Sequence, residues 1–177
     1  MNILFFSSAH DYRQPRKANI HFLADALSRE HDVAFASVGY SFLSYLKSHN
    51  PRAPVAHLAN RITTFDGVRC FLWKSALHPI NLRSSVFNPL SQAALRIYAL
   101  TMPSVLRDWI ESADILVFES GLCITLIPIA SHLNPKAKII YNASDSIATI
   151  GADPLLNKIL HDHRNSIDSV RIPSPAL

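Results

Sequence analysis

The sequence predicts an α/β protein whose parallel sheet of about six strands is covered by helices on both faces. Short apolar runs, each as long as a buried strand, alternate along the chain with segments whose apolar residues recur at helical spacing. This alternation is typical of parallel strands, because each helix carries the chain back to the same end of the sheet. The chain has 177 residues, enough to bury a core, so we expect residues 1–177 to form a single domain.

The expected strands are apolar runs bounded by small or polar residues. They comprise residues 2–9, 32–39, 67–75, 114–120, 137–144 and 169–177. The segment 50–66 contains proline and many polar residues, and we expect it to connect two of these elements.

Helices are expected between the strands, where apolar residues recur at helical spacing. They comprise residues 18–31, 41–49, 90–112, 121–133 and 153–167. Pro103 should divide the long region 90–112, because proline ends or kinks a helix. In the last helix, Asp153 is expected as the N-cap, with Pro154 at the first helical position.

Several function classes are disfavoured by what the sequence lacks. The stretch SSAHDYRQPRKANIHF, where a dinucleotide-binding fold would have a glycine-rich turn, contains no glycine. Neither a GxSxG elbow nor a GxxxxGK[ST] loop is present, which disfavours α/β-hydrolases and P-loop NTPases. Cys70 and Cys123 lie in apolar runs without paired ligand spacing, so we expect two buried thiols, no disulfide and no metal site.

The N-terminus lacks the basic region and the apolar length of a secretory signal, and no apolar run is long enough to cross a membrane. A cytoplasmic location is therefore the default expectation. The net charge of +4 is compatible with a membrane surface, a phosphate-bearing substrate or nucleic acid, and by itself selects none of them.

Polar residues follow most of the expected strands at the point where each strand ends. They are His10 and Asp11, Lys74, Glu119 and Ser120, Ser144 and Asp145, and Ser174. In open α/β sheets, ligands bind outside the carboxyl ends of the strands. We therefore expect these side chains to converge on one ligand-facing edge.

The residues alone leave the role of each group open. Asp145 is either a turn residue that caps the next helix or a catalytic base, and Glu119 either lines the ligand site or acts as an N-cap. His10 and Asp11 are an acid–base or substrate-binding pair, or a loop pair that bonds to local backbone.

A basic loop precedes the first expected helix and carries Arg13, Arg16 and Lys17. It is either a site for an anion or for membrane phosphates, or an ordinary solvated loop.

Taken together, several stretches resemble GumK-type glucuronosyltransferases, which act in assembly of the xanthan repeat unit. The stretches are SAHDYRQPRKANIHFLADAL, YSFLSYLK, CFLWKSALHPINLRSS, DILVFESGLCITLI, NPKAKIIYNASDSIATI and SPA. They occur in order and cover nearly the whole chain. The family has the GT-B architecture, with two Rossmann-like domains that face a cleft, and this chain resembles the N-terminal, acceptor-binding domain.

The resemblance implies an inverting, metal-independent transfer of glucuronate from UDP-glucuronate to a polyprenyl-pyrophosphate-linked oligosaccharide. The UDP-sugar would bind a C-terminal domain that is absent from this chain, which is therefore expected to be inactive alone, and no cofactor is implied. The aspartate of the family's ASD motif, the proposed base, falls on Asp145. Asn142 and Ser146 stand where the family pattern has a basic residue and a glycine.

The resemblance also implies roles for the other candidates. His10, Asp11, Arg13, Glu119 and Ser144 would bind the acceptor, and Arg13, Arg16 and Lys17 would contact lipid phosphates or the acceptor pyrophosphate. The implied partners are the lipid-linked acceptor and the anionic inner face of the cytoplasmic membrane, with no nucleic acid. The alternative is a truncated, non-catalytic module that binds a membrane or a glycan.

Overall fold

The structure is a computed structural model that describes residues 1–45, 50–77, 88–147 and 149–172. The end of the second expected helix, at 46–49, and Ser174 in the last expected strand lie outside the described residues.

Within these residues the strands form one seven-stranded sheet, in the order β3-β4-β2-β1-β5-β6-β7. The strands are β1 (Asn2–Ser7), β2 (Asp32–Ser41), β3 (Ile62–Phe65), β4 (Val68–Ser75), β5 (Ile115–Glu119), β6 (Lys138–Asn142) and β7 (Ser169–Arg171). All of them run parallel except β3, which pairs antiparallel with β4 at the sheet edge. The predicted fold class is confirmed, and β3 is a strand that the sequence analysis did not predict.

The helices that connect the strands lie close to their predicted positions. They are α1 (Asn19–Leu27), α2 (Phe42–Tyr45), α3 (Asn88–Leu100), α4 (Ser104–Ser112), α5 (Ile127–Leu133) and α6 (Leu155–Asp162), with the 3₁₀ helices η1 (Ala53–Leu58), η3 (Leu122–Leu126) and η4 (Arg164–Ser166). Pro103 separates α3 from α4, as predicted. Asp153 accepts the backbone N–H of Leu155 at 2.9 Å, so it caps α6, which begins just after Pro154.

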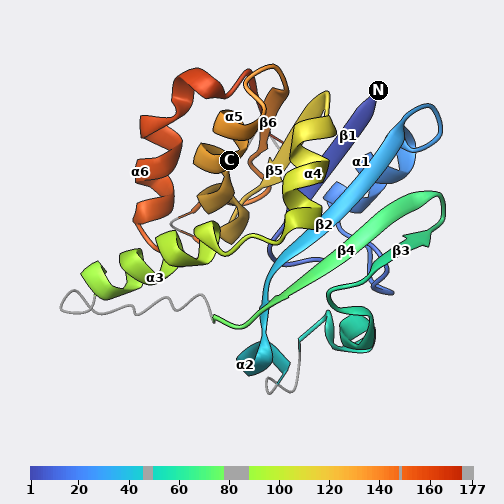
Figure 1. Ribbon diagram of the computed structural model, residues 1–177, viewed down its shortest axis with the longest axis horizontal. Helices are drawn as coiled ribbons and strands as arrows, with labels where there is room; N and C mark the ends of the chain where they lie inside the picture. The colour runs from blue at the N-terminus through green and yellow to red at the C-terminus, as the bar shows by residue number, and fades with distance from the viewer. Residues whose placement is uncertain (46–49, 78–87, 148, 173–177) are drawn as a thin grey trace.

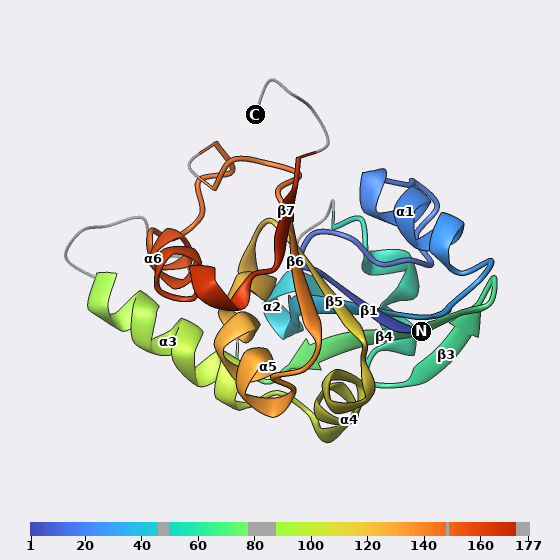
Figure 2. The same cartoon turned by 90° about the horizontal axis from the view of Figure 1, so that it is seen from above.

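Each face of the sheet has its own apolar core, because successive residues of a strand point to opposite faces. In β1, Leu4 and Phe6 join a cluster with residues of α4 and α5, whereas Ile3 and Phe5 join one with residues of α1. Figures 1 and 2 show α1 on one face of the sheet and α4 and α5 on the other. Cys70 and Cys123 are buried and free, as expected.

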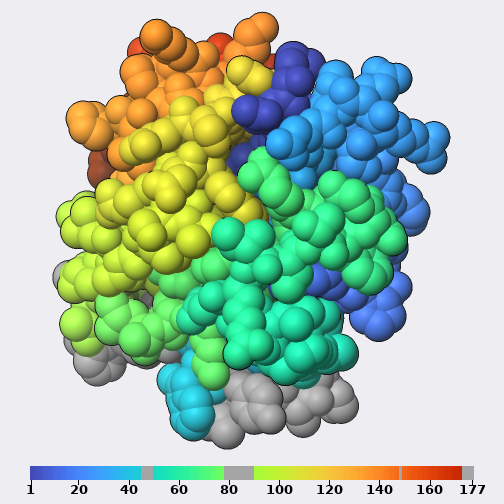
Figure 3. Space-filling model, turned by 45° about the vertical axis from the view of Figure 1, so that its right-hand side comes forward, coloured from blue at the N-terminus to red at the C-terminus, as the bar shows by residue number. Residues whose placement is uncertain are grey.

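Residues 50–66, expected as a connection, contain both η1 and β3. Asp66 and Gly67 form the turn between β3 and β4 and have φ angles of 48° and 78°. Two successive positive φ angles are typical of a type I′ hairpin turn, for which Asp-Gly is a favoured pair. In Figure 3 the η1 segment, in teal, packs against the green hairpin without a break.

The order of the strands reverses between β1 and β5, which lie side by side in the middle of the sheet. From β1 the chain moves outward to β2 and β4, and from β5 it moves outward the other way to β6 and β7. The connections after these two strands therefore leave in opposite directions, and such a switch point, at the carboxyl ends of the strands, is where α/β proteins bind ligands. Ser7 ends β1 and Glu119 ends β5, so both stand at this switch point.

Candidate active site

Glu119 is a buried carboxyl at the switch point between β1 and β5. Its side chain accepts a hydrogen bond from the Ser7 hydroxyl, and the residue is 4% exposed. Burial raises the pKa of Glu119 to about 7, and the nearby negative charge of Asp145 acts in the same direction. Among the described residues the buried Ser144 hydroxyl meets no partner at hydrogen-bonding geometry, yet it lies near enough to Glu119 to favour the charged form. Glu119 can therefore exchange a proton near neutral pH.

Asp145 lies on the loop after β6 and exposes its side chain to solvent. Ser120 holds the backbone of this loop: its hydroxyl donates to the Asp145 carbonyl at 2.8 Å and accepts the Asp145 N–H at 3.3 Å. The same hydroxyl lies 3.1 Å from the Tyr141 hydroxyl. The next helix, α6, begins at Leu155 and has its own cap, so Asp145 is not a helix cap. The loop thus presents a solvent-accessible carboxylate beside Glu119.

Asp11 and Arg13 form a closed, buried ion pair. Arg13 Nε and Nη2 each donate to a carboxylate oxygen of Asp11 at 2.8 Å, and the Ser37 hydroxyl donates to the same carboxylate at 2.8 Å. The remaining Arg13 Nη1 donates to the Thr63 hydroxyl at 2.8 Å. Burial alone would raise the pKa of Asp11, but the hydrogen bonds and charge of Arg13 bring it below its ordinary value.

This pairing bears on two predicted roles, the contact of Arg13 with lipid phosphates and the binding of the acceptor by Asp11 and Arg13. A contact with membrane phosphates would need the Arg13 side chain at the protein surface. That side chain is only 3% exposed, so it is not available for such a contact. The polar atoms of both side chains are already engaged within the protein, which leaves them to hold the loop in place rather than to meet an acceptor directly.

Arg16 and Lys17 differ in how accessible they are. Arg16 is exposed to solvent. Lys17 is half-buried, donates to the Tyr12 carbonyl at 2.9 Å and lies 4.1 Å from the centre of the Tyr12 ring. Of the predicted basic loop, Arg16 therefore offers the most accessible charge.

His10 is neutral and carries its proton on Nε2, which follows from its neighbour Gln14. The Gln14 Oε1 accepts the Asp11 N–H at 3.1 Å, so its amide nitrogen donates to the Arg16 carbonyl at 2.7 Å and faces His10 Nδ1 at 3.1 Å. Nδ1 is thus an acceptor. Burial, with the charges of His21 and Arg52, lowers the pKa of His10 to about 4. His10 is therefore a hydrogen-bond donor at neutral pH and does not pair with Asp11.

Arg52, which the sequence analysis did not single out, also lies in this region. It is 7% exposed, and its charge acts on both His10 and Asp11. It follows a proline in the polar connection, and no motif or spacing marked it.

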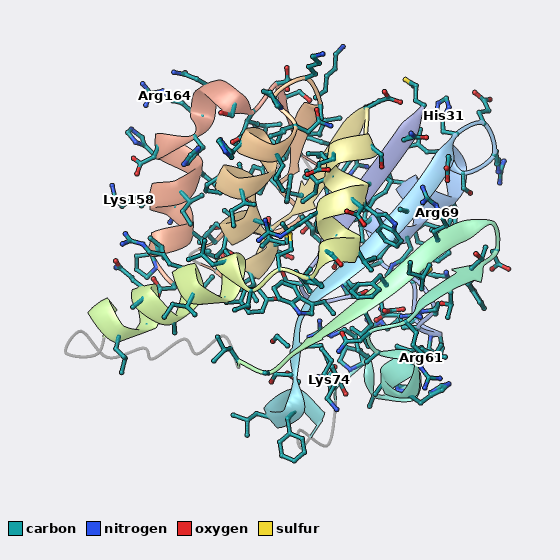
Figure 4. All side chains as sticks on the ribbon, in the orientation of Figure 1. His31, Arg61, Arg69, Lys74, Lys158 and Arg164 are labelled. Carbon is teal, nitrogen blue, oxygen red and sulfur yellow. The ribbon has the colours of Figure 1, made fainter. Side chains whose placement is uncertain are left out.

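Lys74, the exposed residue before the last one of β4, forms two hydrogen bonds between its backbone N–H and carbonyl and the Asn60 side chain. Figure 4 shows it near α2, and Arg61 beside η1.

Across the described parts of the chain, no group of three or more histidine, cysteine, aspartate or glutamate side chains could hold a metal ion. The structure thus brings Glu119, Ser144, Asp145 and His10 to one edge.

Comparison with known proteins identifies relatives of this fold. Residues 6–173 match the family described as glucuronosyltransferase GumK, N-terminal domain. The chain is 39% identical over 170 residues to a UDP-glucuronate:glycolipid 2-beta-glucuronosyltransferase from Xanthomonas campestris pv. campestris. The match covers 96% of this chain and 42% of that relative.

Proposed function

Because the chain belongs to the GumK glucuronosyltransferase N-terminal domain family, we propose that it binds the acceptor for an inverting transfer of glucuronate from UDP-glucuronate to a glycolipid. The observation that carries this proposal is the exposed Asp145 carboxylate, held by Ser120 at the carboxyl edge of the sheet beside the buried Glu119. The chain spans 42% of the relative's length, so the donor would be bound by a further domain.

In the proposed reaction, Asp145 takes the proton of the acceptor hydroxyl as that oxygen attacks the anomeric carbon of glucuronate. The new glycosidic bond forms while the bond from the sugar to UDP breaks, and UDP leaves with the electron pair. Asp145 suits this role because a base must be accessible to the substrate, as its exposed side chain is. Glu119, Ser144 and His10 would line the acceptor pocket.

We further propose that the acceptor is a lipid-linked oligosaccharide of exopolysaccharide assembly, of the xanthan type, at the inner face of the cytoplasmic membrane. A groove of about 400 Å³ at the ends of β2 and β4 supports a membrane contact, since apolar side chains exposed to water line it. They are Phe42, Leu43, Leu77, Leu90 and Ile97. Arg16 would add an accessible positive charge. No helix of the described residues is both long and apolar enough to cross a membrane.

The transfer is tested with this chain joined to the C-terminal part of the Xanthomonas relative. Asp145→Asn should lower kcat by about 10²- to 10⁴-fold, the usual contribution of a general base. Asp108→Asn, an exposed carboxylate on α4, is the matched control and should leave kcat unchanged. Near-normal turnover of Asp145→Asn would refute the assignment of Asp145 as the general base. Glycolipid binding without any turnover in the joined parent would favour a non-catalytic binding module.

A further inference from the structure

Arg52 is a buried cation that has no carboxylate partner among the described residues. It is 7% exposed, and none of the ion pairs in the described chain includes it. Its Nη1 donates to the Val38 carbonyl at 2.6 Å, whereas its buried Nε meets no hydrogen-bond acceptor there. Burial lowers the pKa of this guanidinium, because desolvation disfavours the charged form.

A structural role accounts for only part of this arrangement. The pairing of β2 with β4 shifts register between Ser37 and Tyr40, and Gly39 there has a φ of 74°. The Val38 carbonyl lies at this irregularity, and a single donor satisfies it. A guanidinium brings five N–H donors and a full charge, and its desolvation is unfavourable unless an anion pairs with it. Support of the bulge uses one donor of Arg52, and its guanidinium also lies 5.3 Å from the centre of the Tyr40 ring, but neither contact supplies an acceptor for the buried Nε or an anion for the charge.

A second unused donor belongs to the same region, because Arg52 donates to the Val38 carbonyl while the adjacent Ser37 donates to Asp11, the residue that follows His10. The proton of neutral His10 is on Nε2, because Nδ1 accepts from Gln14, and Nε2 makes no hydrogen bond within the described residues. The charges of Arg52, Arg16 and Asp145 all act on the His10 ring.

We propose that Arg52 and the Nε2–H of His10 form a subsite for an oxyanion, either a carboxylate or a phosphoryl group, beside Asp145. Guanidinium donors match the two oxygens of such a group, and a neutral imidazole adds one hydrogen bond without a second charge. Arg16, at the solvent edge, raises the local positive potential.

The identity of the anion rests on the proposed function, which offers two sources at this edge. One is the carboxylate of the transferred glucuronate, and the other is the phosphate that links the acceptor to its lipid. Both present the same chemistry to Arg52, so the test must separate them by ligand.

The direct test is NMR titration of the 177-residue chain with ¹⁵N-labelled arginine and histidine, at constant ionic strength. The probes are methyl β-D-glucuronide, inorganic pyrophosphate and the uncharged methyl β-D-glucoside. We expect saturable shifts of the Arg52 Nε and His10 Nε2 signals with an anion and not with the glucoside. Tighter binding of the glucuronide assigns the subsite to the transferred sugar, and tighter binding of pyrophosphate assigns it to the lipid phosphate.

Arg52→Met keeps the bulk of the stem and removes the charge, and should weaken anion binding by about 10- to 100-fold, as expected for loss of charge-assisted hydrogen bonds. Arg61→Met removes an exposed charge beside η1 and should bind as the parent does. Absence of saturable shifts in the parent, or equal affinities of the two variants, overturns the proposal.

Two further variants guard against misfolding of Arg52→Met, which far-ultraviolet circular dichroism would reveal. Arg52→Lys keeps a charge but loses the fork, and His10→Phe loses one donor, so each should bind the anion more weakly than the parent. If both bind like the parent, the subsite is wrong. Anion binding is measured without the donor domain, so a joined enzyme that fails to transfer glucuronate would refute the proposed function and not this subsite.

Discussion

Glu119→Gln should stabilise the protein above pH 7 and leave its stability unchanged near pH 4.5. In the folded protein, burial raises the pKa of Glu119 from 4.5 to about 7. Between these values the unfolded chain releases the proton while the folded protein keeps it, so the free energy of unfolding falls as the pH rises and levels off above pH 7. One pKa unit corresponds to ~1.4 kcal/mol, so the full loss is about 3 kcal/mol.

Glutamine has no proton to release, and its amide can still bond to the Ser7 hydroxyl, so the variant should not show this loss. Urea denaturation of the variant and the parent at pH values from 4.5 to 8 measures the difference in free energy of unfolding. His10 contributes an opposite slope, because its lowered pKa costs stability as the pH falls from 6.5 toward 4. Both proteins share that slope, so the difference between them isolates Glu119.

The matched control is Glu111→Gln, which changes an exposed carboxyl on α4 and should leave the pH dependence as in the parent. A difference between Glu119→Gln and the parent that stays constant from pH 5 to pH 8 would refute the reasoning. That result would mean that Glu119 ionises alike in the folded and unfolded states.

Arg13→Gln should lower the free energy of unfolding by about 3–5 kcal/mol in the same assay, because it leaves the buried Asp11 carboxylate without its cation. Arg16→Gln, at an exposed position of the same loop, should change it by no more than ~0.5 kcal/mol, and equal effects would contradict the structural role of the pair. In vesicle flotation, Phe42→Ser should weaken binding to anionic vesicles by about tenfold, because the variant lacks the phenyl ring that membrane binding would transfer out of water. Phe22→Ser on α1 is the control, because both rings are 62% exposed in solution, and equal binding of the two variants would count against the groove as the membrane contact.

The sequence could predict which edge of the sheet carries the site, because strand ends are visible as the points where apolar runs stop. Glu119 and Asp145 end two such runs, and the parallel pairing of β5 with β6 brings them to the same edge. The pairing of Asp11 with Arg13 was not predictable in this way. It depends on the turn of the loop after β1, which hydrogen bonds to Ser37 on another strand help to fix.

β3 was missed although its turn was readable. Asp66-Gly67 between two runs that contain threonine, phenylalanine and valine is a hairpin signal, but the polar residues upstream concealed the short strand. Arg52 left no such signal, because the Val38 carbonyl to which it donates lies at the irregularity of β2, which pairing with β4 reveals and spacing does not.

One departure from the family pattern near Asp145, the one at Asn142, can be weighed in the same physical terms. At the position where the resemblance has a basic residue, Asn142 is fully buried, and its Oδ1 accepts a hydrogen bond from Arg171 Nη1 at 2.7 Å. The same nitrogen donates to Asn19 Oδ1 at 2.9 Å, which ties β7 to the start of α1. A cation is therefore kept beside the strand that leads to Asp145, although it comes from a neighbouring strand 29 residues further along the chain. The lack of a charged residue at one position of a motif is thus weak evidence against the site, because a residue of an adjacent strand can supply that charge.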